Sequence, residues 1–301
     1  MSVASLIRAV DTGTVDQVGV GSPRRRGAFA RLLRDRVALG AGVFLLLLVV
    51  LLLLAPLIAP ADPAAVDTDI GLAGPSWAHP LGTDILGRDL VSRILYGGRV
   101  SVLMTLTASA GITIVGLTMG VATGLMGGRF DALVMRSVEI IQAVPMLIIA
   151  MVAIGLLGRG PDKLVLVFVA VGWPGYTRVI RGATLALRER RYVEASRALG
   201  ATRFRVMLFH LVPNLAGPAT VLSTLDLGRI LLGLTALSFL GFGVQPPHPE
   251  WGRMIADARP YFYLAPRQLV IPGLVVSIFG LAVNLFGDGL RDALDVKVGK
   301  P

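Results

Sequence analysis

The chain has 301 residues, of which 54% are hydrophobic and only 16% are charged, and its mean hydropathy is +0.73. This composition excludes an ordinary soluble domain. The net charge of +10 would suggest nucleic-acid binding in a soluble chain, but here the basic residues follow the membrane topology. The absence of cysteine excludes a disulfide framework, a thiolate metal site and a cysteine nucleophile.

Long apolar blocks predict an all-α polytopic membrane protein. A run of about 18 or more residues with few or no charges is a candidate transmembrane helix. Six spans are predicted, near residues 37–59, 100–124, 137–157, 164–182, 214–241 and 268–287. The polar arm over 1–36 is too long for the start of a signal peptide, so we expect the first span to be retained.

The basic residues predict how the spans are oriented. With both termini in the cytoplasm, the inner segments hold 20 of the 29 Lys and Arg residues, and the outer segments hold 8. This asymmetry follows the positive-inside rule. It predicts a cytoplasmic arm over 1–36, an extracytoplasmic loop over 60–99 and a cytoplasmic tail over 291–301. Membrane lipid, and no nucleic acid, is the expected partner of the basic residues.

Within the first outer loop, residues 79–95 are predicted to form a turn and then an amphipathic helix. Asp84 with Arg88, and Asp89 with Arg93, have the i, i+4 spacing of acid–base pairs on one helix face. Three leucines would then rest on the bilayer surface: Leu86, Leu90 and Leu95. Four outer aromatic residues suit the headgroup level: Trp77, Trp251, Tyr261 and Tyr263.

The motifs of common catalytic and nucleotide sites are missing. No phosphate-binding loop of the G-x-x-x-x-G-K-[ST] type occurs, and the three histidines lie far apart in the sequence. We therefore expect no catalytic residue and no metal site. Active transport by such a chain would draw its energy from an ion gradient or from a partner ATPase.

Few ionisable or strongly polar side chains fall inside the predicted spans. Glu139 and Gln142 lie near the inner end of the third span, and Asp226 and Arg229 lie three residues apart in the fifth. Such residues are costly in a membrane and often mark a transport pathway. Asp226 and Arg229 are therefore either pathway-lining residues or a mutually neutralising buried pair. They leave open an alternative function, an ion-coupled secondary carrier without an ATPase partner.

The charged stretch 188–213 separates two apolar spans. Its pattern predicts a helix over 188–199, a left-handed turn at Gly200, and a second helix over 203–212 that Thr202 caps. Pro213 then marks the junction with the fifth span. A basic helix that merely holds lipid headgroups would explain the arginines, but not the spacing of Glu194, Gly200 and Pro213.

That spacing resembles the cytoplasmic "EAA" loop of bacterial ABC importer permeases, E-A-A-x3-G-x9-I-x-L-P. Four positions match in register: Glu194, Ala195, Gly200 and Pro213. Three positions differ, because Ser196 replaces the second alanine, His210 the isoleucine and Val212 the leucine. The resemblance implies that this loop, within 183–213, is a coupling helix that docks on an ATPase subunit. Glu194 would anchor it, Ala195 and Ser196 would allow close contact, and Gly200 would form the turn.

Other segments resemble the C-type permease subunit of dipeptide and oligopeptide ABC importers, in register over residues 30–297. They are "HPLGTDILGRDLVSRIL" (79–95), "GGRFDALVMR" (127–136), "LSFLGFGVQPPHPEWGRMI" (237–255) and "NLFGDGLRDALDVK" (284–297). The resemblance implies a type I ABC importer permease fold, with a core over 100–290, in a bacterial inner membrane. The implied solute is a peptide or a related compound such as haem, glutathione or nickel.

The same resemblance implies partners rather than cofactors. A homologous B-type permease would complete the pathway, one or two ATPase subunits would bind ATP, and an extracytoplasmic solute-binding protein would deliver the solute. The motif residues of the outer loop are a structural cap, a direct substrate contact, a docking surface for the binding protein or part of the outer gate: Gly82, Thr83, Asp84, Gly87, Arg88 and Asp89. A non-transporting scaffold or receptor, the third function considered, would not need the Glu194, Gly200 and Pro213 register.

Overall fold

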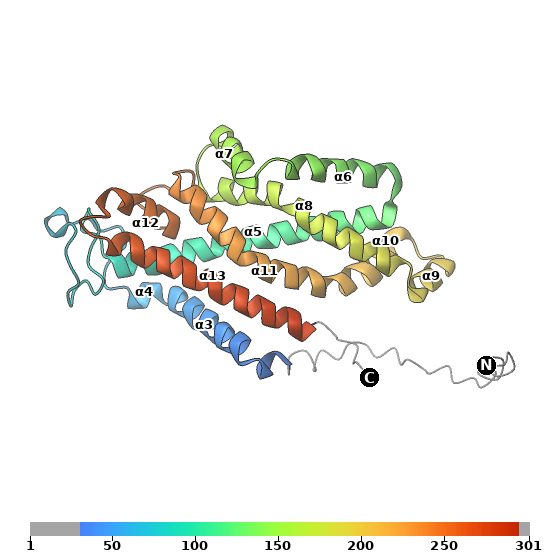
Figure 1. The fold of residues 1–301 in the computed structure, drawn as a ribbon, viewed down its shortest axis with the longest axis horizontal. Coiled ribbons are helices and arrows are strands. Elements are labelled where there is room, and N and C mark those ends of the chain that lie inside the picture. The colour runs from blue at the N-terminus through green and yellow to red at the C-terminus, as the bar shows by residue number, and fades with distance from the viewer. Residues whose placement is uncertain (1–30, 295–301) are drawn as a thin grey trace, which may run out of the picture.

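The structure, a computed structural model, describes residues 31–294 as an all-helical bundle (Figure 1). The predicted arm up to residue 30 and the tail from residue 295 lie outside the described residues. The helices are α3 (Arg36–Leu53), α4 (Ala55–Ile58), α5 (Leu90–Met126), α6 (Gly128–Gln142), α7 (Met146–Leu157), α8 (Pro161–Arg188), α9 (Arg191–Ala198), α10 (Arg203–Val206), α11 (Val212–Phe239), α12 (Trp251–Ala258) and α13 (Arg267–Leu294). Shorter turns are η1 (Thr68–Ile70), the π-helical η2 (Met207–Leu211) and η3 (Arg259–Tyr261).

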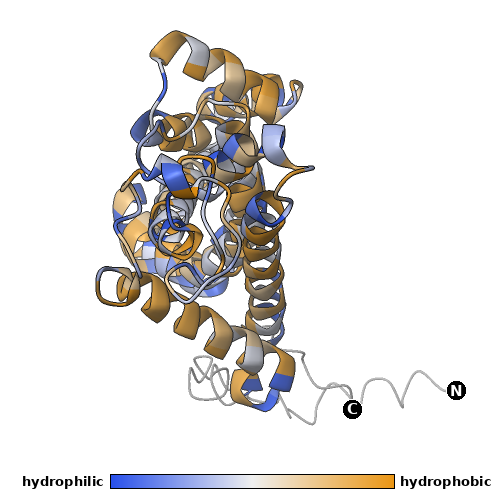
Figure 2. Cartoon of the chain, turned by 90° about the vertical axis from the view of Figure 1, so that its left-hand side faces the viewer, coloured by the Kyte–Doolittle hydropathy of each residue, from blue (hydrophilic) through white to orange (hydrophobic). Residues whose placement is uncertain are grey.

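Five helices among residues 31–294 are long and apolar enough to cross a membrane: α3, α5, α8, the continuous helix Arg203–Phe239, and α13. Between 17% and 44% of the most apolar window of each is buried within the chain. Viewed from the end that carries residues 60–89, the helical ribbon is hydrophobic over most of its length (Figure 2). So much exposed apolar surface requires lipid or an apolar partner around the bundle.

The third predicted span is a bent pair of helices rather than one straight rod. α6 ends at Gln142, α7 begins at Met146, and the two axes meet at 91°. The cause is local: proline disfavours helical backbone at the residue before it, so the chain leaves the helix ahead of Pro145. If this pair counts as one span, the described residues have the six spans that the sequence predicts.

A stripe of glycines brings α5 and α8 together. The facing pairs, one helical turn apart, are Gly116 with Tyr176, Gly120 with Ile180 and Gly124 with Thr184. A Cβ atom on Gly120 would lie only 2.7 Å from Cβ of Ile180, well inside the contact distance of two carbon atoms. Because lipid removes the hydrophobic drive between helices, such close packing is what holds them together.

The short helix α12 is held inside the bundle by a buried acid. The carboxylate of Glu250 accepts hydrogen bonds from the backbone N–H groups of Gly252 and Arg253, both at 2.9 Å, and from the Ser101 hydroxyl at 3.0 Å. Burial raises the pKa of the Glu250 carboxyl above its ordinary value, while the two backbone donors favour the charged form. The hydrogen bond from the Ser101 hydroxyl joins α12 to α5.

The outer aromatic residues divide into two groups. Trp251 is fully buried and its Nε1 donates to the carbonyl oxygen of Ile94 at 3.0 Å, so the expectation that it lies at the headgroup level is wrong. It follows Glu250 on the inward face of α12, where its ring packs against Phe279. Trp77 and Tyr263, in contrast, are almost fully exposed.

The glycine stripe generates a stability prediction. Gly120→Ala places a methyl group against Ile180 and is expected to destabilise the fold by about 1–3 kcal/mol through overpacking. The midpoint of thermal unfolding in detergent should fall by several degrees. Gly182→Ala on α8 is the matched control, because a Cβ there meets nothing within 4 Å. Equal midpoints for the two variants would contradict the packing role of the stripe.

Candidate functional site

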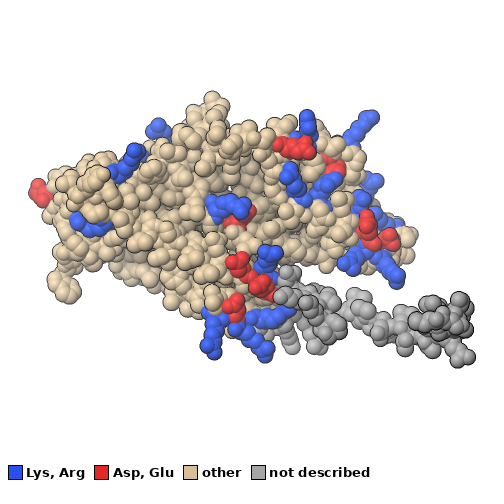
Figure 3. Space-filling model, in the orientation of Figure 1, with Lys and Arg blue, Asp and Glu red and all other residues tan. Residues whose placement is uncertain are grey.

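The two polar segments that the sequence singles out lie at opposite ends of the bundle. Residues 60–89 form loops at one end, and α9 and α10 project from the other (Figure 1). On the face drawn in Figure 3, charged residues gather at the right-hand end and along the lower edge, a few lie at the left-hand end, and a pair of opposite charges stands in the otherwise uncharged middle. This arrangement fits a chain whose two polar segments face opposite sides of a membrane.

The outer segment has the predicted turn followed by a helix, but the helix starts later than predicted, so the expectation that Asp84 and Arg88 share a helix face is wrong. Residues 79–89 form a compact loop, and α5 begins only at Leu90, since the Asp89 side chain accepts from the Ser92 N–H at 2.7 Å. Gly82 and Gly87 have φ angles of +82° and +70°, which other residues rarely adopt. Leu90 and Leu95 are buried in the bundle instead of resting on the bilayer.

The ion pairs of this loop are partly those predicted. Nε of Arg88 lies 2.7 Å from Oδ2 of Asp84, as the spacing indicates, but the pair closes a loop rather than a helical turn. Arg93 turns to Asp84 as well, at 3.5 Å, and not to Asp89. Asp89 instead contacts Nδ1 of His79 at 3.0 Å. All of these side chains but His79 are nearly buried, so the pairs are structural.

The loop is also fastened to the start of α13. Thr83 is fully buried, and its hydroxyl accepts the N–H of Ala73 at 3.0 Å. Gln268 donates to the Thr83 carbonyl oxygen at 3.0 Å, and Arg267 donates to the Ala73 carbonyl oxygen at 2.7 Å. The polar groups of the motif are thus used within the protein, which favours the structural-cap interpretation. A role in gating stays a prediction.

At the other end, the predicted helix, turn and helix are present. α9 covers most of the predicted range and starts later, because α8 runs on to Arg188. Gly200 has φ +86°, and the N–H groups of Gly200 and Ala201 bond back to the carbonyls of Arg197 and Ser196. This is the Schellman pattern that ends a helix at a glycine. Thr202 then caps α10, since its hydroxyl accepts the Arg205 N–H at 3.3 Å.

One face of this loop is anchored and the other is free. Val193 is fully buried in a cluster that also contains Ile180 of α8 and Leu211. Glu194, Ala195 and Gly200 are exposed. The large apolar side chains Leu199 and Phe204 are 90% and 66% exposed. An exposed apolar tip beside a carboxylate is the composition of a docking surface.

Two departures from the family pattern contact each other. Oγ of Ser196, on α9, lies 3.1 Å from Nε2 of His210, in the η2 segment. The His210 ring also lies beside that of Tyr192, with centroids 6.1 Å apart. The serine and the histidine therefore form one polar contact that fixes α9 against the base of α11.

Pro213 lies at the start of α11, at the junction that the sequence predicts. The helix runs without interruption from Arg203 to Phe239. Proline has no N–H and its ring would collide with the carbonyl four residues earlier in a regular α-helix. The π-helical η2 segment widens the helix just ahead of it, with the Val212 N–H bonded to the Met207 carbonyl. Nδ2 of Asn214 donates to the His210 carbonyl oxygen at 2.6 Å.

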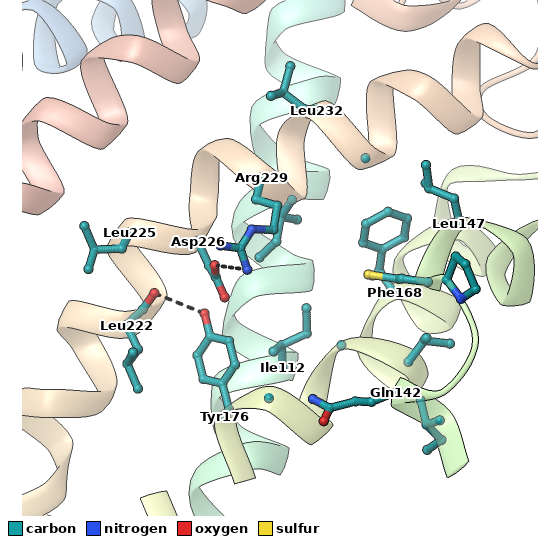
Figure 4. Close-up of a pocket in the computed structure, with 18 of the residues that line it drawn as sticks. Ile112, Gln142, Leu147, Phe168, Tyr176, Leu222, Leu225, Asp226, Arg229 and Leu232 are labelled. Carbon is teal, nitrogen blue, oxygen red and sulfur yellow. Dashed lines mark hydrogen bonds and ion pairs between the residues drawn. The ribbon is translucent and has the colours of Figure 1, made fainter. Parts of the chain in front are cut away.

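A cavity of about 1090 Å³ lies between α6, α7, α8 and α11. It contains both predicted pathway residues, and Oδ1 of Asp226 lies 3.0 Å from Nη1 of Arg229 (Figure 4). Gln142 from the end of α6 and Tyr176 from α8 add polar groups, and the Tyr176 hydroxyl donates to the Leu222 carbonyl at 3.3 Å. Sequence reasoning missed Tyr176. The feature that could have pointed to it is a phenol hydroxyl within an otherwise apolar span.

Comparison with known proteins places the chain in a family. The profile described as "Binding-protein-dependent transport system inner membrane component" matches residues 113–300, and "N-terminal TM domain of oligopeptide transport permease C" matches residues 23–75. The chain belongs to this family of permeases. It is therefore an inner-membrane permease component of a binding-protein-dependent ABC importer. The resemblance stated from the sequence is confirmed.

Individual relatives agree with the family. The Di/tripeptide transport system permease protein DppC of Pseudomonas aeruginosa is 42% identical over 88% of this chain and 89% of its own length. The Nickel transport system permease protein NikC of Escherichia coli is 40% identical over 78% and 85%. The inward-facing MetNI methionine ABC transporter shares the fold with a TM-score of 0.51 at 19% identity, over 67% of this chain and 97% of that one.

The contact between Ser196 and His210 generates a second prediction. Ser196→Ala removes a hydrogen bond of about 1 kcal/mol, so local opening of α9 should become about fivefold more frequent. Hydrogen–deuterium exchange of residues 191–198 in nanodiscs measures this opening. Ser137→Ala on α6, which removes only a bond to the Leu133 carbonyl, is the control and should leave α9 unchanged. Unaltered exchange in the Ser196 variant would show that the contact does not hold α9.

Proposed function

We propose that this chain is the permease subunit of a bacterial importer of di- and oligopeptides, with a homologous B-type permease as its partner in the pathway. One or two ATPase subunits would bind and hydrolyse ATP, and an extracytoplasmic binding protein would deliver the peptide. The chain itself would carry no catalytic residue and no cofactor. Membership of the permease family and 42% identity to a di/tripeptide permease support this proposal.

The observation that carries the coupling role is the form of the loop after α8. α9 is a short helix that projects from the bundle, rests on Val193 and leaves Glu194 and Ala195 exposed. Its end at Gly200 presents Leu199 to solvent. A groove on an ATPase subunit would receive this tip, with Glu194 as polar anchor and Ala195 and Ser196 at the points of close contact.

Movement of the tip has a direct route to the cavity. The helix that starts at Arg203 continues to Phe239, and Asp226 lies about 35 Å along it, at 1.5 Å per residue. α9 is joined to the base of this helix by the Ser196–His210 contact. Closure of the ATPase subunits around α9 would therefore tilt α11 and change the cavity that Asp226 and Arg229 line.

The ion-coupled alternative has less support. Its strongest feature is the Asp226–Arg229 pair, but a pair of opposite charges is neutral and resembles no proton relay. The family is binding-protein-dependent, and in such an importer the projecting loop would dock on an ATPase subunit. An ion-coupled carrier would not need such a loop.

Gly200→Asp tests the coupling role. The variant is expected to insert and assemble normally but to lose uptake, because a side chain at φ +86° strains the turn and obstructs docking. Uptake of a labelled dipeptide by cells, beside the amount of assembled complex, measures the effect.

Gly241→Asp is a matched control for backbone strain. Gly241 ends α11 in the same Schellman pattern, has φ +89° and also has open space around it, but it lies at the other end of the helix. It should retain most of its uptake. Normal uptake by the Gly200 variant would overturn the coupling assignment, and equal loss in both variants would attribute the effect to strain.

The orientation in the membrane can be measured with single cysteines, because the natural chain has none. Trp77→Cys and Leu199→Cys place thiols on fully exposed positions at opposite ends of the bundle. In spheroplasts, a membrane-impermeant maleimide should label the first at once and the second only after permeabilisation. Labelling of both from the same side would overturn the predicted topology.

A further inference from the structure

The charges of the cavity lie where a membrane tolerates them least. Asp226 and Arg229 are near the middle of α11, one of the helices long enough to span the bilayer. The side chain of Arg229 is 83% exposed, and that of Asp226 is 24% exposed. A charged side chain at the bilayer centre costs about 2.5–3.5 kcal/mol on insertion scales. This face of α11 therefore meets water or a polar ligand rather than lipid.

The ion pair leaves most of the Arg229 guanidinium unused. Its Nη1 contacts Oδ1 of Asp226, and within residues 31–294 no other hydrogen bond of Arg229 is found. A guanidinium has five N–H donors, arranged to match a carboxylate. The pair is also of the exposed i, i+3 type, which contributes little on its own and so is readily opened.

The rest of the cavity is neutral. Asp226 and Arg229 are the charged residues among those that line it, and neither histidine nor any second carboxylate is present there. Apolar side chains form most of the walls, with Phe168, Ile112 and Leu232 close to the pair (Figure 4). A site with one positive and one negative group and apolar surroundings complements a ligand of the same kind.

We propose that Asp226 and Arg229 form a binding site for the charged ends of a zwitterionic peptide in transit. Arg229 binds the peptide carboxylate, Asp226 binds the ammonium group, and the peptide side chains rest on the apolar walls. The proposal rests on the peptide-importer function and adds to it a site within the permease itself. The pair thus has two states, closed on itself when the cavity is empty and opened around a peptide.

The dimensions of the cavity agree with a short peptide. Pockets for small molecules measure about 300–1,000 Å³, and this cavity of about 1090 Å³ is at the upper end. The ends of an extended dipeptide are about 7 Å apart, at about 3.5 Å per residue. The long, exposed side chain of Arg229 can swing away from Asp226 by that distance.

The chemistry of the lining disfavours the other solutes. A divalent metal ion such as nickel prefers imidazole or several carboxylates, and the cavity offers one carboxylate already paired with a cation. A ligand with only an anionic group or only a cationic group would bind one member of the pair and leave the other without a partner. A zwitterion satisfies both members at once.

Three related peptides test the site: Ala-Phe, its C-terminal amide and its N-acetyl derivative. Binding to the assembled complex in nanodiscs, without the binding protein, is followed by saturation-transfer NMR, which detects weak ligands. Ala-Phe should bind at least fivefold more tightly than either capped peptide. Arg229→Gln should weaken the binding of Ala-Phe at least fivefold and leave the binding of the C-terminal amide almost unchanged. Asp226→Asn should likewise weaken the binding of Ala-Phe at least fivefold, and it should leave the binding of the N-acetyl peptide almost unchanged.

Arg136→Gln is the matched control, because Arg136 belongs to an exposed i, i+3 pair with Glu139 that lies outside the cavity lining. It should bind all three peptides as the natural protein does. Equal binding of the three peptides by the natural complex, or unchanged binding of Ala-Phe by both cavity variants, would refute the site. Loss of the second permease from the Arg229 variant would refute it too, since the pair would then be an interface contact.

Uptake by the same complexes in proteoliposomes, with the binding protein added, separates this proposal from the proposed function. If Ala-Phe is transported but does not bind selectively at the pair, the site is wrong and the importer function stands. If no peptide is transported while ATP is hydrolysed, the peptide-importer function itself is wrong.

Discussion

The close approach of α5 and α8 is the contact on which the rest of the bundle depends. Water drives apolar surfaces together in a soluble protein, but lipid does not, so helix association must come from van der Waals packing. Glycines at every fourth position of α5 let the two backbones meet, and α8 then presents Tyr176 and Phe168 to the cavity. Even a methyl group at Gly120 would move α8, and with it one wall of the cavity.

The two ends of the molecule use their polar residues in opposite ways. At the outer end, the side chains of Thr83, Asp84 and Asp89 accept hydrogen bonds from the backbone of neighbouring loop and helix residues. The loop therefore forms a rigid cap. At the other end, Glu194 and the arginines around it remain exposed, while Val193 and Ser196 fasten α9 to the bundle. A polar residue that is satisfied internally stabilises the fold, whereas one left exposed on a projecting helix is free to bind a partner.

Sequence reasoning succeeded where the cause of a structure is local. Gly200 and Thr202 end and start helices through bonds between residues three to five positions apart, and the six apolar blocks follow from composition alone. It failed where the cause was distant or hidden. The side chain of Arg93 contacts Asp84 rather than Asp89 because the loop folds back. Pro145 bends the third span although its apolar run is continuous in the sequence. The contact of Ser196 with His210 joins residues that the pattern shows only as two separate mismatches.

The π-helical η2 segment has a consequence for register. A π turn holds one residue more than an α turn, so it rotates everything beyond it by about 100° relative to everything before it. The loop that ends at Thr202 and the face of α11 that carries Asp226 are thus set at a fixed angle by a single extra residue. If residues 207–211 formed a regular α-helical turn instead, Asp226 and Arg229 would face a different neighbour. The width of a single helical turn thus decides which side of the transmembrane helix faces the cavity.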